Sequence, residues 1–350
     1  MKKNLTLTLA AIVTASFAYA QGNVSTVTST GSGNSASVSQ TGLTNLADIT
    51  QIGDGNSGSQ TQNGTSNEAY IDQTGNVNTA SQQQYGTTNL AEVDQTNSAS
   101  GNYASQYQSG TNNWAYAIHY LTNHESYQNQ YGDENTAITD LYGNSNYSYQ
   151  YQSGFSNWAQ TYITGGDNSL SQNQSGTDNY AYVNQTGNFN NSNQYQSGNN
   201  NWGSVYQTGN SNNGLQYQFG NANTSYYQQT GNFNLAYQLS NGTGNLTVAY
   251  QNGNGNHSEQ TQGFSRVLGE DGTLLGWNFT SASDYNYASV DQDGDDNDAI
   301  QTQNGAGSNS AQTFQNGIGN SAQTSQTGNN HMSTITQTGN GNSAVVTQNN

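Results

Sequence analysis

The stretch NSASVSQTGLTNLADITQ, residues 34–51, decides the fold. It contains one eleven-residue unit and the first seven residues of the next. An asparagine opens the unit, a glutamine follows six residues later, and a glycine comes two residues after that, as in Asn34, Gln40 and Gly42. Twenty-eight such units start between residues 23 and 342, of which 26 open with Asn and 23 carry the Gln. A fixed short period indicates a stack of identical structural units.

Residues within a unit alternate in character, which is typical of a β-strand. Position three is small, as in Ala36 and Ala47, and position five is often Val, Ile, Thr or Gln, as in Val38. The positions between them carry Asp, Glu, Tyr and Trp, so the small and aliphatic positions must face inward. Glycine at position nine permits a tight turn. Each unit therefore predicts a seven-residue strand and a four-residue turn.

Two consecutive units predict one rung of strand-turn-strand-turn. We therefore expect an all-β fold, a β-solenoid of about fourteen rungs with two parallel in-register sheets and a rung spacing of about 4.8 Å. Side-chain amides stacked at this spacing can bond to the rungs above and below, forming ladders. The predicted ladder residues include Asn34, Gln40, Asn45, Gln51, Asn56, Gln62, Asn67, Gln73, Asn179, Gln185, Asn320, Gln326, Asn342 and Gln348. The predicted turn glycines include Gly42, Gly53, Gly75, Gly187 and Gly209.

The chain divides into a leader, two repeat regions and a break between them. Residues 1–20 begin with a basic segment, continue with a short apolar run and end in Ala-Tyr-Ala, the pattern of a secretory signal peptide. Repeats occupy residues 21–262 and 286–350. Residues 263–285 lose the register, and we expect an insertion loop or a degenerate repeat there, with Asn278 to Asp284 as one strand.

Charge and composition exclude several kinds of function. After residue 20 only Arg266 is basic, against 21 acidic residues in the chain, so nucleic acid is not an expected partner. The chain contains neither cysteine nor proline. No arrangement of residues typical of catalysis is present, so we predict neither an enzyme nor a cofactor.

The repeat resembles the curlin repeat of curli fibre subunits, and the motif of residues 34–51 carries the resemblance through about residues 23 to 348. The resemblance implies a secreted, extracellular functional amyloid of the biofilm matrix that serves cell adhesion as a cell-surface fibre. It also implies other curlin-type subunits or a nucleator, an outer-membrane secretion channel and periplasmic chaperones as partners, besides copies of the chain itself. Such a chain would polymerise through its open solenoid edges.

Two local clusters are candidate binding features. Trp114, Trp158 and Trp202 recur at a regular spacing of four units, which predicts one outward column. The column either stiffens the stack or forms an adhesive surface for polysaccharide. The acidic run that includes Asp291, Asp293 and Asp295 is either a solvated turn or a weak calcium site, because it lacks the glycine and glutamate of an EF-hand loop.

Two other functions fit a repetitive β-rod. A monomeric repeat adhesin would need capped ends, and we find no proline, charge-rich or helical cap in the sequence. An ice-binding β-solenoid would present one repeated outward residue, whereas the outward columns here mix Ser, Tyr, Asp and Asn.

Overall fold

The computed structural model describes residues 22–268, 274–279, 283–305 and 307–349, so the predicted signal peptide lies outside the described residues. All described regular structure is β, and the chain forms two compact units, Met1–Asn146 and Tyr147–Asn350. The described residues contain no helix that could cross a membrane.

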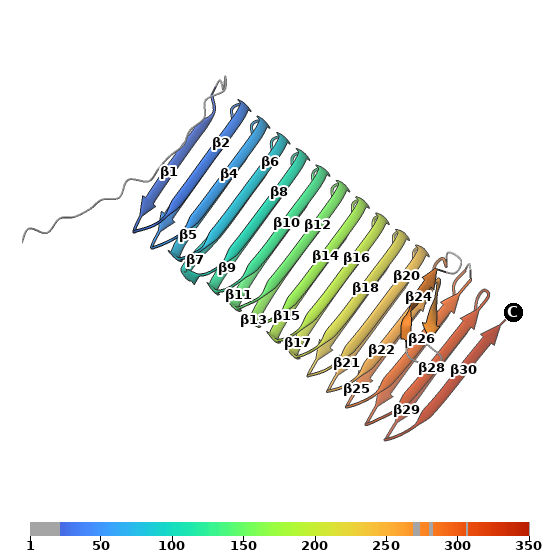
Figure 1. Ribbon diagram of the computed structural model, residues 1–350. Helices are drawn as coiled ribbons and strands as arrows, with labels where there is room; N and C mark the ends of the chain where they lie inside the picture. The colour runs from blue at the N-terminus through green and yellow to red at the C-terminus, as the bar shows by residue number, and fades with distance from the viewer. Residues whose placement is uncertain (1–21, 269–273, 280–282, 306, 350) are drawn as a thin grey trace, which may run out of the picture. The chain divides into compact units, whose positions relative to one another are not determined.

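The first unit contributes to two parallel sheets (Figure 1). The odd sheet contains, in spatial order, β1 (Val24–Thr30), β3 (Leu46–Ile52), β5 (Glu68–Asn76), β7 (Leu90–Ser100), β9 (Trp114–Thr122) and β11 (Thr136–Asn144). The even sheet contains β2 (Ser35–Leu43), β4 (Ser57–Thr65), β6 (Thr79–Thr87), β8 (Tyr103–Thr111) and β10 (Glu125–Asp133). Consecutive strands in the chain alternate between the sheets, as the repeat predicts.

The second unit follows the same pattern. Its odd-sheet strands are β13 (Trp158–Gly166), β15 (Tyr180–Asn188), β17 (Trp202–Asn210), β19 (Thr224–Thr230), β21 (Leu246–Asn252), β25 (Tyr287–Asp293), β27 (Ser310–Asn316) and β29 (Met332–Thr338). Its even-sheet strands are β12 (Tyr147–Phe155), β14 (Ser169–Thr177), β16 (Asn191–Asn199), β18 (Asn213–Asn221), β20 (Leu235–Thr243), β22 (His257–Gln262), β26 (Asp298–Asn304), β28 (Ser321–Thr327) and β30 (Ser343–Asn349). Each sheet contains 14 strands, so the predicted β-solenoid is confirmed.

Neighbouring strands pair in parallel and in register. Leu46 lies opposite Glu68, two repeats later in the chain, and Tyr180 lies opposite Trp202. A bulge in β7 absorbs the two-residue slip of the repeat, so that Leu90 pairs with Trp114. Because the sheet continues after the bulge, the slip adds backbone without ending the stack.

The interior between the two sheets is thin and combines aliphatic side chains with small ones. In the first unit Ile49, Ile71 and Val93 of the odd sheet pack with small residues of the even sheet, including Ala80 and Ala104. A Cβ at Gly58 would lie 2.9 Å from Cγ2 of Ile49. The small residues at position three therefore bring the two sheets close together.

The turns depend on a left-handed backbone. At Gly187 φ is 119°, and a Cβ there would lie 1.9 Å from the carbonyl oxygen of Gly209 in the next rung. The five predicted turn glycines have φ between 104° at Gly42 and 132° at Gly75. Stacked glycines thus allow one turn to lie directly on the next.

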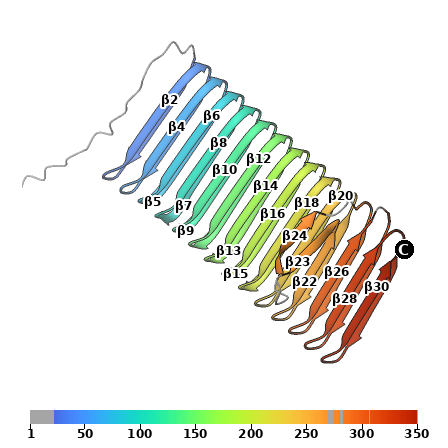
Figure 2. The same ribbon diagram turned by 45° about the vertical axis from the view of Figure 1, so that its right-hand side comes forward.

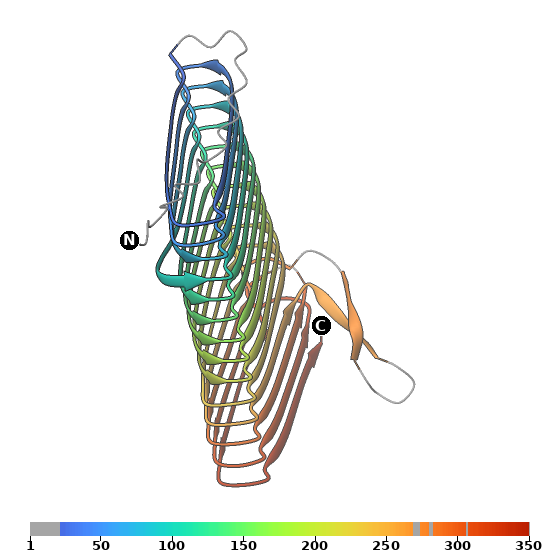
Figure 3. The same ribbon diagram turned by 60° about the vertical axis from the view of Figure 1, so that its left-hand side comes forward.

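The break in the repeat contains an antiparallel hairpin, β23 (Phe264–Leu268) and β24 (Leu274–Phe279). β24 includes the first two residues of the strand expected from Asn278 to Asp284, and residues 280–282 lie outside the described residues. The hairpin stands beside the strands of its own unit in Figures 2 and 3. The odd sheet continues across it, because Leu246 before the hairpin pairs with Tyr287 after it.

The hairpin region covers part of the outer face of the even sheet. Glu259 and Thr261 occupy outward positions of β22, yet both are fully buried. Phe264 is also buried, and its ring centroid lies 5.9 Å from that of Phe219. The inserted segment therefore replaces solvent over strands that would otherwise be exposed.

Candidate functional site: stacked amide columns and outward faces

The glutamines at position seven form buried columns. Nε2 of Gln51 donates to Oε1 of Gln73 at 3.0 Å, and Nε2 of Gln73 donates to Oε1 of Gln95 at 2.9 Å. Gln51 Nε2 also reaches across to the carbonyl oxygen of Ser35 at 2.9 Å. Each amide therefore links its rung both to the next rung and to the facing sheet.

The asparagines at position one form a second kind of column, with the opposite direction. Both the backbone N–H and Nδ2 of Asn67 donate to Oδ1 of Asn45, each at 3.1 Å. Nδ2 of Asn67 also donates to the carbonyl oxygen of Gly86 at 3.0 Å. Asparagine thus joins the start of a strand to the previous rung and to the stacked turns.

All fourteen predicted ladder residues take part in such contacts. The asparagine pairs include Asn56 N with Oδ1 of Asn34, and Asn342 Nδ2 with Oδ1 of Asn320 at 2.9 Å. The glutamine contacts include Gln40 to Gln62, Gln185 to Gln207 and Gln326 to Gln348, with distances of 2.8, 2.7 and 2.8 Å. Asn179 donates to Asn157 at 2.9 Å.

A third column was not predicted from the sequence. At position five of the even strands, Gln60 donates to Gln82, Gln82 to Gln106 and Gln106 to Gln128, with N···O distances of 2.8 to 2.9 Å. The odd strands carry mostly aliphatic residues or threonine at this position. The signal in the sequence was glutamine at both positions five and seven in most of the even units, and it shows that the two sheets differ.

One aromatic residue interrupts the inner face of the odd sheet. Tyr227 occupies position five of β19, is fully buried, and its hydroxyl lies 2.9 Å from Oγ of Ser192. A Cβ at Gly214 would lie 1.9 Å from the Tyr227 hydroxyl oxygen. The phenol therefore fills the space that a missing side chain leaves in the facing strand.

Two histidines replace amides on either side of one turn of the first unit. His119 takes the place of a glutamine and His124 the place of an asparagine; both are fully buried, and their ring centroids are 5.8 Å apart. Burial, and secondarily the charge of His124, lowers the pKa of His119 to about 3. Burial also lowers the pKa of His124. Both rings are therefore neutral at pH 7.

The predicted tryptophan column includes a tyrosine in the second unit. The Tyr180 ring stacks between Trp158 and Trp202, with centroid distances of 4.4 and 5.8 Å and interplanar angles of 11°. The stacking covers both faces of Tyr180 and leaves ring edges at the surface. Trp114, in the first unit, is 39% exposed. A ligand of this column would therefore contact the exposed ring edges, because the faces of Tyr180 are already covered.

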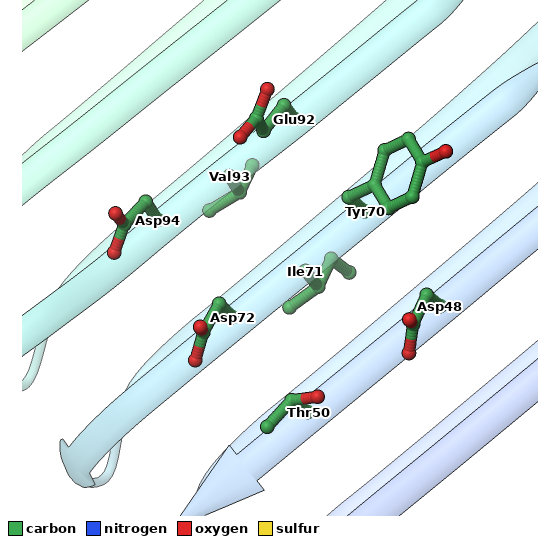
Figure 4. Close-up of a pocket in the computed structure, with 8 residues that line it drawn as sticks. All are labelled: Asp48, Thr50, Tyr70, Ile71, Asp72, Glu92, Val93 and Asp94. Atoms are coloured by element: carbon green, nitrogen blue, oxygen red, sulfur yellow. The ribbon is translucent and has the colours of Figure 1, made fainter.

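The outer face of β3, β5 and β7 carries a shallow acidic groove (Figure 4). Carboxylates of Asp48, Asp72, Glu92 and Asp94 lie on adjacent strands, and Ile71 lies behind them. Burial, and then the charges of Asp94 and Asp48, raises the pKa of Asp72. Burial, and then the charge of Asp94, raises the pKa of Glu92. Ionised carboxylates on adjacent strands therefore destabilise the folded state at neutral pH.

Two residues of the acidic run, Asp293 and Asp295, hydrogen-bond to neighbouring asparagines. Oδ1 of Asp293 accepts from Nδ2 of Asn252 at 2.9 Å, and Oδ1 of Asp295 accepts from the backbone N–H of Asn254 at 2.7 Å. Asp291 lies on the outward face of β25, where burial, and then the charge of Asp293, raises its pKa. Among the residues that the structure describes, no group of three His, Asp or Glu side chains is placed to hold a metal ion.

Comparison with known proteins agrees with this repetitive architecture. The family described as the curlin associated repeat matches residues 45–75, 61–81, 307–339 and 319–349. No curated protein matches the sequence. The matches fall in both units, on strands whose Asn and Gln columns are described above. The chain therefore contains curlin-associated repeats in both of its units.

Proposed function

We propose that this protein is a structural subunit of an extracellular, curli-like amyloid fibre that self-assembles by adding strands to the ends of its two sheets. The observation that carries the proposal is that the interfaces between successive rungs resemble one another. Each rung binds the next through parallel backbone pairing and the same kinds of amide contact, such as Gln51 to Gln73. A second copy of the chain offers the same groups, so joining two copies repeats an interface already made many times.

The end strands of the described sheets support this mode of growth. β1 and β29 end the odd sheet, and β2 and β30 end the even sheet, so each has one strand neighbour within the described residues. An unpaired strand edge templates the addition of another strand. Secretion, a place in the biofilm matrix, a nucleating subunit, a dedicated outer-membrane channel and periplasmic chaperones belong to the same proposal, and the curlin repeats support them.

The test is assembly of the purified chain without residues 1–20. We expect fibres that bind thioflavin after a lag phase, shortened by preformed seeds, with cross-β reflections at about 4.7–4.8 Å and 10 Å. A chain that stays monomeric at high concentration, with or without seeds, would overturn the proposal.

Adhesion is the part of this proposal that concerns the outward aromatic residues. Trp114 and Trp202 are each 39% exposed. Fibres of the Trp202→Ala variant should bind polysaccharide or cell surfaces less well than the parent fibres while growing at the same rate. If growth slows and binding per fibre is unchanged, the aromatic column stiffens the stack and has no adhesive role.

A further inference from the structure

We propose that the turn between β9 and β10 is an acid-sensitive switch, in which protonation of His119 and His124 opens the turn and interrupts the glutamine column and the asparagine column that contain these two residues. Its bearing on fibre growth rests on the proposed function, whereas the opening itself does not. Three departures from the repeat meet in this one turn: the two histidines and Leu121, which replaces the turn glycine.

His124 reproduces the contacts of an asparagine only when it is neutral. Its Nε2 donates to the carbonyl oxygen of Tyr120 at 2.8 Å, and its Nδ1 accepts from the backbone N–H of Asn146 at 3.2 Å. A protonated imidazole has two donors and no acceptor. Protonation would therefore place two N–H groups against each other and remove the acceptor that holds Asn146.

The contacts of His119 also require a neutral imidazole ring. Its Nδ1 faces Nε2 of Gln95, a donor, at 3.5 Å, and its Nε2 lies 2.8 Å from Oγ of Ser126. The glutamine column from Gln51 through Gln95 therefore ends on an acceptor that exists only in the neutral ring. Protonation at Nδ1 would turn this contact into a clash of donors.

The side chains around His119 offer no charge to offset a proton on its ring. Its inward neighbours are Gln95 on β7, Ser126 on β10 and Leu141, its register partner on β11, and none of them titrates. In the described part of the first unit, the titratable group that faces His119 is His124. A proton on one ring would therefore also repel a proton on the other.

His124 is surrounded by neutral groups as well. Its backbone N–H donates to Asn102, its ring accepts from Asn146, and the carbonyl oxygens of Tyr120 and Gly143 offset only part of the effect of burial on its pKa. Among the carboxylates that follow along the chain, Glu125 on β10 and Asp140 on β11 occupy outward positions of these strands. Asp133 and Glu134 are exposed at the turn between β10 and β11. No carboxylate is therefore placed inside the turn to stabilise an imidazolium, among the residues described for this unit.

The backbone of this turn is also strained. Leu121 has φ of 80°, in the left-handed region that leucine rarely adopts. Such strain persists only while the surrounding contacts hold it. Loss of the two histidine contacts would therefore release a turn that already tends to open.

The sign of the pH effect follows from proton linkage. Burial lowers the pKa of His119 from its ordinary value of 6.5 to about 3. The open state thus binds protons that the closed state excludes, and stability is lost as pH falls below 6.5. For His119 alone, the equilibrium constant for opening should rise about 20-fold between pH 7 and pH 5.

The experiment measures amide hydrogen exchange by mass spectrometry in peptides from residues 114–133 of the unassembled chain lacking residues 1–20. Exchange rates corrected for their intrinsic pH dependence should rise at least about 20-fold from pH 7 to pH 5 in the parent. They should not rise in the double variant His119→Gln/His124→Asn, whose residues are the usual ones at these positions. Equal pH dependence in the two proteins, or none in the parent, would overturn the proposal.

Two control variants separate titration from strain. Leu121→Gly should slow exchange at every pH without changing its pH dependence, because it relieves the backbone only. His331→Asn changes a half-buried histidine at position one of a repeat in the second unit, so its exchange in residues 114–133 should match the parent. If Leu121→Gly abolished the pH dependence, strain would be the cause and the histidine switch would be wrong.

Fibre growth shows whether the switch matters for assembly. If the proposed function holds, the parent should elongate seeds more slowly at pH 5 than the double variant does, relative to their rates at pH 7. If neither protein forms fibres at any pH, the proposed function fails while the exchange result still decides the switch. Equal growth of both proteins at pH 5 would overturn its role in assembly.

Discussion

Single residues decide where this repeat tolerates change. Most interior positions carry the same few side chains in rung after rung, but some depend on one partner in the facing sheet. Gly214 and Tyr227 are such a pair, since the phenol occupies the space where a side chain at residue 214 would lie.

We expect Gly214→Ala to destabilise the second unit by about 1–3 kcal/mol, because overpacking displaces Tyr227 and its contact with Ser192. Urea unfolding followed by circular dichroism would measure the loss. Adding Tyr227→Val, a residue common at position five, should restore most of the stability. If Gly214→Ala is as stable as the parent, the assigned packing is wrong.

In many rungs the last residue of the eleven-residue unit, directly before the asparagine of the next unit, also adopts the left-handed backbone. Some of these residues are of types that rarely adopt this conformation. Val77 has φ of 58° and is 65% exposed, so its side chain contributes little packing. Val77→Gly should stabilise the first unit by about 0.5–1 kcal/mol, the relief of strain less the added freedom of the unfolded chain. The matched change Val345→Gly, at an exposed strand position, should destabilise the chain when both are compared by urea unfolding. Equal effects at the two sites would contradict this explanation.

At the scale of elements, the hairpin is an insertion within one repeat. It lies between Gly263, at position eight of its repeat, and Ser283. Ser283 stacks on Gly242 and so occupies position nine, where a turn glycine usually lies. Bonded glutamines of the odd sheet are 22 positions apart before the hairpin and 41 positions apart across it. Residues 264–282 account for the whole of this difference. The solenoid path therefore continues as though the hairpin were absent.

Deletion of residues 264–282 should leave the two sheets intact, as judged by circular dichroism, while uncovering Glu259 and Thr261. The loss of the buried Phe264 should cost about 1.5–3 kcal/mol in the stability of the second unit. A control that deletes residues 264–281 instead should put the following repeats out of register and cost more. Complete unfolding of the 264–282 deletion would show that the hairpin is needed for the stack.

Much of the fold can be predicted from the eleven-residue period of the sequence, and the remaining features depend on contacts between distant units. The spacing of Asn34, Gln40 and Gly42 predicts the strands, the turns and two of the amide columns. It does not reveal which units face which, so the third glutamine column and the fit of Tyr227 against Gly214 appear only when the sheets are paired. It also marks where the hairpin interrupts the repeat without showing that this segment covers part of β22.

At the scale of the whole molecule, acidic residues greatly outnumber basic ones, with a net charge of −18. Burial raises the pKa of Asp140 to about 6, and the pKa values of Asp72 and Glu92 are also raised. A carboxyl group whose pKa is raised in the folded state binds a proton more tightly in the folded state than in the unfolded state. Stability from these groups therefore increases as pH falls from 7 toward 5.

This effect opposes that of the histidines, so it should be visible once they are removed. In the His119→Gln/His124→Asn background, the urea midpoint should rise as the pH is lowered from 7 to 5. Adding Asp140→Asn should raise the midpoint at pH 7 and flatten the pH dependence. A midpoint that falls with acidification in the double variant would contradict the assignment to these carboxylates.

The opposite directions of the asparagine and glutamine columns have an electrical consequence. Gln51 donates toward later rungs, whereas Asn67 donates toward earlier ones. Aligned amide dipoles in a single column would add head to tail, as they do along an α-helix, and would build up partial charge at both ends. The asparagine dipoles therefore offset part of the glutamine dipoles along the stack. Lengthening the stack therefore adds hydrogen bonds without adding a matching electrostatic cost at its ends.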